Sequence, residues 1–177
     1  VSLLVVHCPA WQVSVPQAQD GLQDDSRWRL EFALGFAQLK TLDVVPTIVG
    51  AARALGLSQT ACARLHTVLS ELYANALEHG LLLLDSSLKE ADNGFELFMN
   101  ERQRRMQALS GGEIVVNLMS AGREGLKLRV RDSGEGFLYR AENSACEPGL
   151  SGRGLALVYS LCRSVQYFGC GNEVEVE

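Results

Sequence analysis

The sequence predicts an α/β two-layer sandwich, in which a mixed, mainly antiparallel sheet carries helices on one face. Several short segments alternate apolar and polar residues, as half-buried strands do. Between them, the apolar residues from Arg64 to Gly80 recur every three or four positions, which indicates a helix with one buried side. A chain of 177 residues with 47% hydrophobic content can form one sizeable core, burying roughly 70% of its unfolded surface. We therefore expect one main domain.

Charge and cysteine content narrow the function classes. The net charge of −5 and the pI of about 5.3 give no general attraction for nucleic acid or an anionic membrane, so a protein partner or a small ligand is favoured. The five cysteines are odd in number and include no C-x-x-C pair, which indicates neither a disulfide framework nor a zinc site. We expect reduced thiols, a cytoplasmic protein, and no nucleic-acid or membrane partner.

The first 27 residues are predicted to precede the main domain, which we place at residues 28–177. Residues 1–8, V-S-L-L-V-V-H-C, indicate a strand and are too short to span a bilayer. The chain has no initiator Met, so we expect it to be a fragment of a longer protein. Residues 9–27 are predicted to be a linker, because Pro16 and several Gln, Asp and Ser residues interrupt any periodicity.

The domain is predicted to begin with a strand and two helices. Residues 28–34 alternate between large apolar and other side chains, which indicates a strand. A helix is expected from Asp43 to Leu55, with Gly56 as its stop. Ser58 is the predicted N-cap of the long helix that follows.

Glu71 and Asn75 are the first candidate site residues on that long helix. They are one turn apart and project roughly 40° from each other, at the edge of the apolar stripe. A carboxamide oxygen suits Mg²⁺, and a half-buried Glu can act as a general base. The alternative is a solvated polar pair. His79, at the end of the helix, is interpreted either as a phosphate contact or as an ordinary polar residue of a helix terminus.

Residues 81–110 form an unusual segment after this helix. Leu81 to Leu84 is apolar but too short for a membrane span. Residues 86–109 predict one or two amphipathic helices. Their candidates for a packed face are Phe95, Leu97, Phe98, Met99, Met106 and Leu109. The cationic run Arg102-Gln103-Arg104-Arg105 is either a solvated face or a docking site.

A strand at residues 113–118 and another from Leu126 to Asp132 are predicted next. The glycines Gly134 and Gly136 leave the backbone free to approach something flat. The carboxylate of Asp132 can accept the exocyclic amine of adenine. The alternative is a D-S-G turn that merely closes a strand.

Glycines also precede the last predicted helix. Gly149, Gly152 and Gly154 open an amphipathic helix whose N-terminal amides can cradle phosphate. The side chains expected to pack inward are Leu157, Val158, Leu161 and Val165. Residues 164–168 and 173–177, joined by G-C-G-N, predict a closing hairpin.

In their order and spacing, three of these segments resemble the N box and the two glycine boxes of the GHKL (Bergerat) ATP-binding fold, which DNA gyrase, Hsp90, MutL and sensor histidine kinases share. The segments are Glu71-x-x-x-Asn75-Ala76, Asp132-x-Gly134-x-Gly136-Phe137 and Gly152-Arg153-Gly154-Leu155. The resemblance implies that Asp132 holds the adenine of ATP, that Asn75 carries Mg²⁺, and that a lid at residues 138–151 covers the triphosphate. The cofactor-binding residues it implies are Asn75, Glu78, His79, Asp132, Gly134, Gly136, Phe137, Gly152, Arg153, Gly154 and Leu155, with Asn75 as the metal ligand.

Glu71 helps to choose among branches of that family. Sensor histidine kinases commonly place Asn at this position, because imidazole is already a nucleophile, whereas a hydroxyl or water benefits from a base. Gyrase-like ATPases use a lysine from a second domain, for which we expect no room after Glu177, and His7 and His66 do not lie in a phospho-accepting box. The pattern is similar to the anti-sigma-factor serine kinases of the RsbW and SpoIIAB type. This resemblance implies Glu71 as the catalytic residue and a STAS-domain antagonist protein as the phospho-acceptor.

The segment at residues 81–110 indicates the kind of larger protein to which this domain belongs. Insertions that begin D-S-x-L-K, as at Asp85, are similar to those in kinase domains at the C-terminal end of fused response-regulator and phosphatase proteins of the HsbR type. Residues 1–8 resemble the closing strand of a PPM-type phosphatase domain. The implied function is a partner switch that also controls a sigma or anti-sigma factor, with homodimerisation left open. Two alternatives remain: an ATP-dependent clamp that sequesters a regulator without kinase activity, and the ATP-binding half of a histidine kinase.

Overall fold

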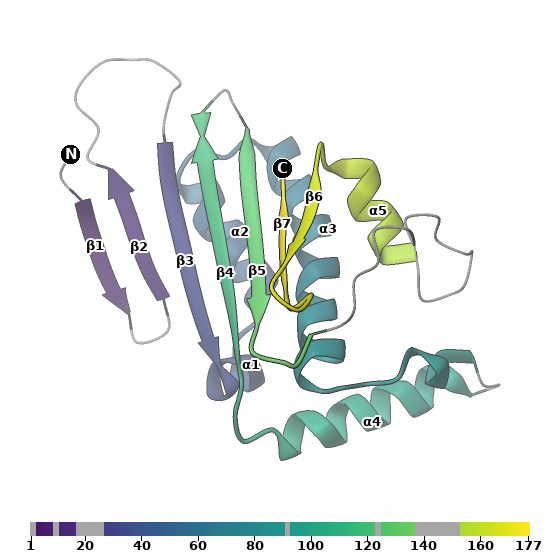
Figure 1. The fold of residues 1–177 in the computed structure, drawn as a ribbon. Helices are drawn as coiled ribbons and strands as arrows, with labels where there is room; N and C mark the ends of the chain where they lie inside the picture. The colour runs from purple at the N-terminus through teal and green to yellow at the C-terminus, as the bar shows by residue number, and fades with distance from the viewer. Residues whose placement is uncertain (1–2, 9–10, 17–26, 91–92, 123–124, 137–152) are drawn as a thin grey trace.

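The structure, a computed structural model, describes residues 3–8, 11–16, 27–90, 93–122, 125–136 and 153–177. Its strands form one sheet in the order β1-β2-β3-β4-β5-β7-β6 (Figure 1). They are β1 (Leu3–Cys8), β2 (Trp11–Pro16), β3 (Arg27–Gly35), β4 (Glu113–Ala121), β5 (Leu126–Asp132), β6 (Val165–Phe168) and β7 (Glu173–Val176). The sequence predicts a mixed, mainly antiparallel sheet, and every described strand pair is antiparallel.

Helices pack on one face of this sheet, which confirms the predicted two-layer arrangement (Figure 1). They are α1 (Phe36–Thr41), α2 (Val44–Ala54), α3 (Gln59–Ala74), the π-helix η1 (Asn75–Leu81), the 3₁₀-helix η2 (Ser86–Glu90), α4 (Gly94–Ala108) and α5 (Arg153–Leu161). The helix α1 is not predicted by the sequence pattern, because its six residues hold too few turns for a periodic pattern. No helix in the described ranges is both long enough and apolar enough to cross a membrane.

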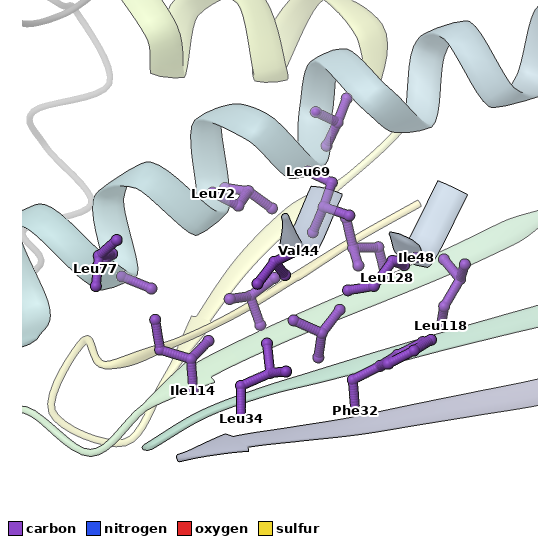
Figure 2. Close-up of a cluster of buried hydrophobic side chains, with 14 of the residues drawn as sticks. Phe32, Leu34, Val44, Ile48, Leu69, Leu72, Leu77, Ile114, Leu118 and Leu128 are labelled. Carbon is purple, nitrogen blue, oxygen red and sulfur yellow. The ribbon is translucent and has the colours of Figure 1, made fainter. Parts of the chain in front are cut away.

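The core lies between the sheet and the helix layer. Trp28, Leu30, Phe32 and Leu34 of β3 are buried, while the residues between them are exposed or half-buried. Figure 2 shows leucines of the helix layer above side chains of the strands, with α2 contributing from the side. The labelled members of this cluster are Phe32, Leu34, Val44, Ile48, Leu69, Leu72, Leu77, Ile114, Leu118 and Leu128. Each such side chain stabilises the fold by about 1.5–3 kcal/mol when fully buried, so these contacts set the rotation of α3 about its axis.

The opposite face of the sheet is polar. On β5, Arg129 pairs with Glu173 at 2.8 Å and with Glu175 at 2.9 Å. Lys127 pairs with Glu175 and Glu177, both at 3.0 Å. Charged pairs across neighbouring strands suit a solvated surface, which is why the helix layer forms on the other face.

The described N-terminal strands, β1 and β2, join the sheet. β2 lies within the segment predicted as a linker, and its Gln12, Val13 and Ser14 pair with Glu31, Leu30 and Arg29 of β3. The sequence predicts an interruption of the periodicity at Pro16, whereas Pro16 is the last residue of β2 and the alternation W-Q-V-S-V before it forms the strand. The descent of β1 from a phosphatase domain stays a prediction.

The long helix begins and turns as predicted, but it ends differently. The hydroxyl oxygen of Ser58 accepts a hydrogen bond from the amide of Ala61 at 3.3 Å, which confirms the N-cap. The sequence predicts one α-helix up to His79 and Gly80, whereas the structure changes to a π-helix at Asn75. The amide of Leu82 donates to the carbonyl of Leu77 at 2.8 Å, one residue farther than in an α-helix. A π-turn inside a helix is often found at a functional site.

The predicted amphipathic segment after this helix is η2 followed by α4, but its packed face is narrower than expected. Phe98 is buried, and Met106 and Leu109 pack partly against the core. Phe95 and Leu97, expected to be packed, are 77% and 50% exposed. Met99 is also exposed. Because α4 touches the core with one narrow stripe, neighbouring positions on the helix face outward.

The cationic run on α4 serves mainly to attach this helix. Arg105 donates to the carbonyls of Leu82 at 2.8 Å and Leu83 at 2.5 Å, just beyond the end of η1. Arg102 donates to Glu78 of η1 at 3.0 Å. Carbonyls at a helix end have no partner within the helix, so the two bonds from Arg105 satisfy the carbonyls of Leu82 and Leu83. Arg102 and Arg105 therefore attach α4 to η1 and to the residues after it, which differs from both predicted roles, a solvated face and a docking site.

The inward face of α5 also differs from the prediction. Val158 is fully buried as expected, but Leu157 and Leu161 are 40% and 36% exposed. The inward stripe instead follows Leu155, Val158 and Cys162. These residues are spaced three and four apart, and α5 packs beside α3, so the inward face of α5 is rotated relative to the expected one.

Candidate functional site

A cavity of about 500 Å³ lies between α3 with η1, the end of β5, the β6–β7 hairpin and the start of α5. Its size falls in the range of small-molecule sites, roughly 300–1,000 Å³. Several residues of the three sequence motifs meet here although they are distant in the chain. The predicted site residues in its lining are Glu71, Asn75, Glu78, His79, Asp132, Gly136, Gly154 and Leu155.

Glu71 and Asn75 reach the cavity because the core fixes the rotation of α3. Leu69 and Leu72 are buried against the sheet, so the flank of the helix that bears Glu71 faces the cavity. The carboxylate of Glu71 lies directly against Gly154, where a Cβ would collide with its Oε2. Within the described part of the chain, Glu71 makes no hydrogen bond or ion pair. This carboxylate is therefore available to a ligand or a substrate proton.

The alternation of side chains along β5 directs Asp132 into the cavity. Leu128 and Val130 are buried under the helix layer, and the alternation of the strand brings Asp132 to the same face. Its side chain is only 8% exposed. Burial raises the pKa of this carboxyl, while a hydrogen bond from the amide of Gly134 at 2.8 Å opposes the shift. A buried carboxylate with one oxygen bonded to an amide can accept a further hydrogen bond from a ligand.

Two glycines allow this close packing around Asp132. A Cβ on Gly80 would lie 2.5 Å from Oδ1 and 2.6 Å from Cγ of Asp132. A Cβ on Gly134 would collide with the carbonyl oxygen of Gly80. The π-helix and the end of β5 therefore meet at contacts that only glycine permits.

Asn172, in the turn between β6 and β7, holds the backbone of Asp132 from the other side. The amide of Asp132 donates to the carbonyl of Asn172, and Nδ2 of Asn172 donates to the carbonyl of Asp132, both at 3.0 Å. Gly171, Glu173 and Tyr167 from the same hairpin also line the cavity. This hairpin thus fixes the strand end that carries the buried carboxylate.

The remaining motif glycines lie around the same cavity. Gly136 has a left-handed φ of 77°, and a Cβ there would collide with the carbonyl of Cys170. Gly154 follows the first residue of α5, so its amide belongs to the N-terminal turn of that helix. Phe137, Gly152 and the predicted lid at residues 138–151 lie outside the described residues, as does the side chain of Arg153.

Comparison with known protein families identifies this arrangement. Residues 36–177 match the family described as histidine kinase-like ATPase domain. This chain belongs to the histidine kinase-like ATPase family. A search of the curated proteins finds no match. Membership establishes a GHKL-type fold with an ATP-binding, kinase-like function for the part of the chain from α1 to the C-terminus.

The residues of this ATPase domain fit ATP and Mg²⁺. The cavity has the volume of a nucleotide-sized ligand, and glycine rather than a larger side chain stands at Gly80, Gly136 and Gly154 along its wall. Asp132 offers a hydrogen-bond acceptor to a purine amine. Asn75 and Glu71 supply oxygens, the ligand type of Mg²⁺, which is usually bound by one or two protein groups together with phosphate oxygens and water.

Glu78 and His79 of the ATPase domain line the cavity but also have partners within the protein. Glu78 pairs with Arg102 at 3.0 Å and with Lys89 at 3.9 Å. Nδ1 of His79 donates to the carbonyl of Leu84 at 2.9 Å. This bond agrees with the polar helix-end interpretation of His79, and its other ring nitrogen stays available to the cavity. Glu78, as a carboxylate, is suited to bind cations rather than phosphate.

Sequence reasoning missed several lining residues of the ATPase domain. Gly80 and Asn172 stand beside motif residues, and their polar or glycine character in a turn or helix end was a usable signal. Ser86 and Lys89 come from η2, within the segment at residues 81–110. No periodicity or motif connects that segment to the cavity, so only the fold could show this contact.

Proposed function

We propose that this ATPase domain is a serine/threonine protein kinase of the partner-switching type, which phosphorylates a STAS-domain antagonist of an anti-sigma factor. The observation that supports it most is Glu71, whose carboxylate lies in the cavity against Gly154, one turn before Asn75. A hydroxyl acceptor needs a base to take its proton, whereas an imidazole acceptor is already nucleophilic. A carboxylate with no partner in the described residues therefore favours a serine or threonine acceptor.

The other residues have roles in binding and orientation in this proposal. Bound ATP with Mg²⁺ supplies the phosphoryl group and part of the charge that the transfer requires. Asp132 accepts the adenine amine through the oxygen that Gly134 leaves unoccupied, and Asn75 offers its side-chain oxygen to Mg²⁺. Amides at the start of α5, near Gly154, donate to phosphate oxygens. Glu71 takes the proton of the acceptor hydroxyl.

Replacing Glu71 by Gln tests the proposal. The variant keeps the size of the side chain and removes its basicity, so we expect transfer to a STAS-domain protein to fall on the order of 10²–10⁴-fold. ATP affinity should stay unchanged, because the base acts on the acceptor. The measurement is incubation with γ-labelled ATP and purified STAS-domain proteins from the same genome, with calorimetry for ATP binding. Full transfer by Glu71→Gln would remove Glu71 from this role.

Acid treatment of the labelled products separates the two rival functions. Phosphoserine and phosphothreonine survive acid, whereas phosphohistidine does not. Acid-labile label would indicate the ATP-binding half of a histidine kinase, which the family membership also allows. A STAS or sigma-factor complex that depends on ATP but carries no label would indicate a sequestering clamp.

The regulatory partners belong to the same proposal. A kinase of this type would act as a switch by binding a sigma or anti-sigma factor when its STAS-domain antagonist is phosphorylated. Pull-down of these factors with ATP and with ADP would test that switch, and light scattering would show whether the chain forms a homodimer.

A further inference from the structure

The charge of the cavity wall is unbalanced. Its described lining includes the carboxylates of Glu71, Glu78 and Asp132, whereas Glu173, which also borders the cavity, directs its carboxylate to Arg129 on the other face of the sheet. Lys89 is the only lysine or arginine that lines the cavity in the described part of the chain. A nucleoside triphosphate brings further negative charge into this site, and like charges repel strongly where water is partly excluded. A protein cation that faces the phosphates would offset this charge together with Mg²⁺.

Lys89 stands on η2, near the end of that short helix. Its ammonium group lies over the ring of Phe98, 3.9 Å from the ring centroid. Phe98 is itself buried, at 2% exposure. A cation over a buried ring is held in place by electrostatic attraction to the π-electrons, and the N–H bonds that point away from the ring stay open to other acceptors.

The ion pair with Glu78 does not use the hydrogen-bond donors of Lys89. Nζ of Lys89 is 3.9 Å from Oε2 of Glu78, beyond hydrogen-bond distance. Arg102 makes the short contact with Glu78, from Nε to Oε1 at 3.0 Å. An ammonium has three donors, and in the described residues Lys89 has only this long ion pair and the ring contact. The donors that do not face the ring are open to a ligand in the cavity.

The backbone that carries Lys89 is also held in place. A Cβ on Gly94, which opens α4, would lie 2.6 Å from the carbonyl oxygens of Leu88 and Lys89, so η2 and α4 are in close backbone contact. At the start of η2, the amide of Ser87 donates to Oδ1 of Asp85 at 2.9 Å. A binding group that is already ordered loses less entropy when its ligand arrives.

We propose that Lys89 binds the phosphate chain of the nucleotide and that the segment at residues 81–110 thereby completes the ATP site. The inference rests on the proposed function only in that ATP occupies the cavity. Phe98 and Glu78 hold the ammonium in position, and Arg102 neutralises Glu78 so that Lys89 keeps its charge for the ligand. The segment is then a part of the nucleotide site rather than an attachment to its surface.

The test is Lys89→Met, with the affinities for ATP, ADP, AMP and adenosine measured by calorimetry in the presence of Mg²⁺. Methionine keeps an unbranched apolar side chain over Phe98 and removes the charge. We expect ATP and ADP affinity to fall on the order of ten- to a hundredfold, as for the loss of a charged hydrogen bond, while adenosine affinity stays the same. Lys89→Arg should restore most of the loss.

Lys40→Met is the matched control. Lys40 also lies over a ring, 5.7 Å from the centroid of Phe36, but it does not line the cavity. This variant changes the net charge equally and should leave all four affinities unchanged. An equal fall in Lys40→Met would reduce the effect of Lys89 to general electrostatics and overturn the proposal.

Other outcomes of these titrations distinguish the role of Lys89 from the kinase proposal. If Lys89→Met weakens adenosine as much as ATP, Lys89 has a structural role only, and if it weakens neither, the residue does not touch the phosphates. Both results overturn this inference but leave the kinase proposal intact. Normal ATP binding with a phosphate-dependent loss in Lys89→Met, but no acid-stable label on any STAS protein, supports the inference and sinks the kinase proposal instead. Wild-type protein that binds no ATP overturns both.

Discussion

Asp132 is a residue at which binding and stability oppose each other. Its carboxyl is buried against the helix layer, and this desolvation raises its pKa above the ordinary value of 3.8. The folded protein therefore holds the proton more tightly than the unfolded chain does, and ionisation of the buried group destabilises the fold. Stability from the protonated form is present below pH 3.8 and is lost as the pH rises through the raised pKa. A group that lowers stability at neutral pH is expected where function requires it.

Asp132→Asn separates the two effects. Because Asn stays neutral, we expect the ligand-free variant to unfold at a higher temperature than the wild type at pH 7, with a smaller difference near pH 4. ATP affinity should fall by about tenfold or more, because the second side-chain group becomes an NH₂ donor opposite the adenine amine. Calorimetry of unfolding at both pH values and ATP titration check this. The same temperature difference at both pH values would contradict the ionisation argument.

The contact between η1 and β5 is the element-scale feature that shapes the site. A plain α-helix was expected here, but the π-helix brings Gly80 against the carboxylate of Asp132. On its other side, η1 is attached to α4 through the pair of Glu78 with Arg102. The site is therefore formed where three elements meet, and its geometry depends on how closely their backbones can lie.

Gly80→Ala tests that contact. The new Cβ would lie 2.5 Å from Asp132 Oδ1, so the carboxylate or the helix must move. We expect a loss of about 1–3 kcal/mol in the free energy of unfolding together with weaker ATP binding. Gly50→Ala is the control. Gly50 lies in the middle of α2 and is exposed, and a Cβ there meets nothing within 4 Å.

The control variant should be more stable than the wild type by up to about 1 kcal/mol, since alanine is the better helix former. Urea unfolding and ATP titration of both variants give the comparison. Normal ATP affinity in Gly80→Ala would show that the close contact with Asp132 is not needed for binding.

Across the whole molecule, the hairpin β1–β2 and the cavity lie at different parts of one sheet. The hairpin extends the sheet beyond β3, whereas the cavity uses β5, the β6–β7 hairpin and the helices beside them (Figure 1). The match to the ATPase family begins at residue 36, after both strands of the hairpin. The described strands of the hairpin therefore cover an edge of the sheet and do not line the cavity.

Deletion of residues 1–26 is expected to keep ATP affinity and to increase self-association. The first described lining residue of the cavity is Glu71, so the binding residues are retained. The backbone groups of β3 that pair with β2 would become an open edge, which favours pairing between chains. Light scattering and ATP titration of the truncated and full chains test this. Loss of ATP binding would show that the hairpin is needed for the fold of the domain.

Most of the two layers could be predicted from the sequence, because their signals are local. The strand at β3, the N-cap at Ser58 and the strand that ends at Asp132 each follow from a few neighbouring residues. Local patterns failed where an element was very short, as in α1, or where one proline hid an alternation, as in β2. The packed faces of α4 and α5 were misjudged because amphipathic periodicity does not say which neighbour a helix will meet.

What the sequence by itself determined is the layered fold and the order of the ATP-site motifs, since periodicity and short motifs depend on residues near each other in the chain. The tertiary structure alone decided that Gly80, Asn172 and Lys89 meet Asp132 and Glu71 around one cavity. It also decided the π-turn of η1 and the place of the hairpin in the sheet. These features depend on the packing of segments far apart in the chain, which a local pattern does not encode.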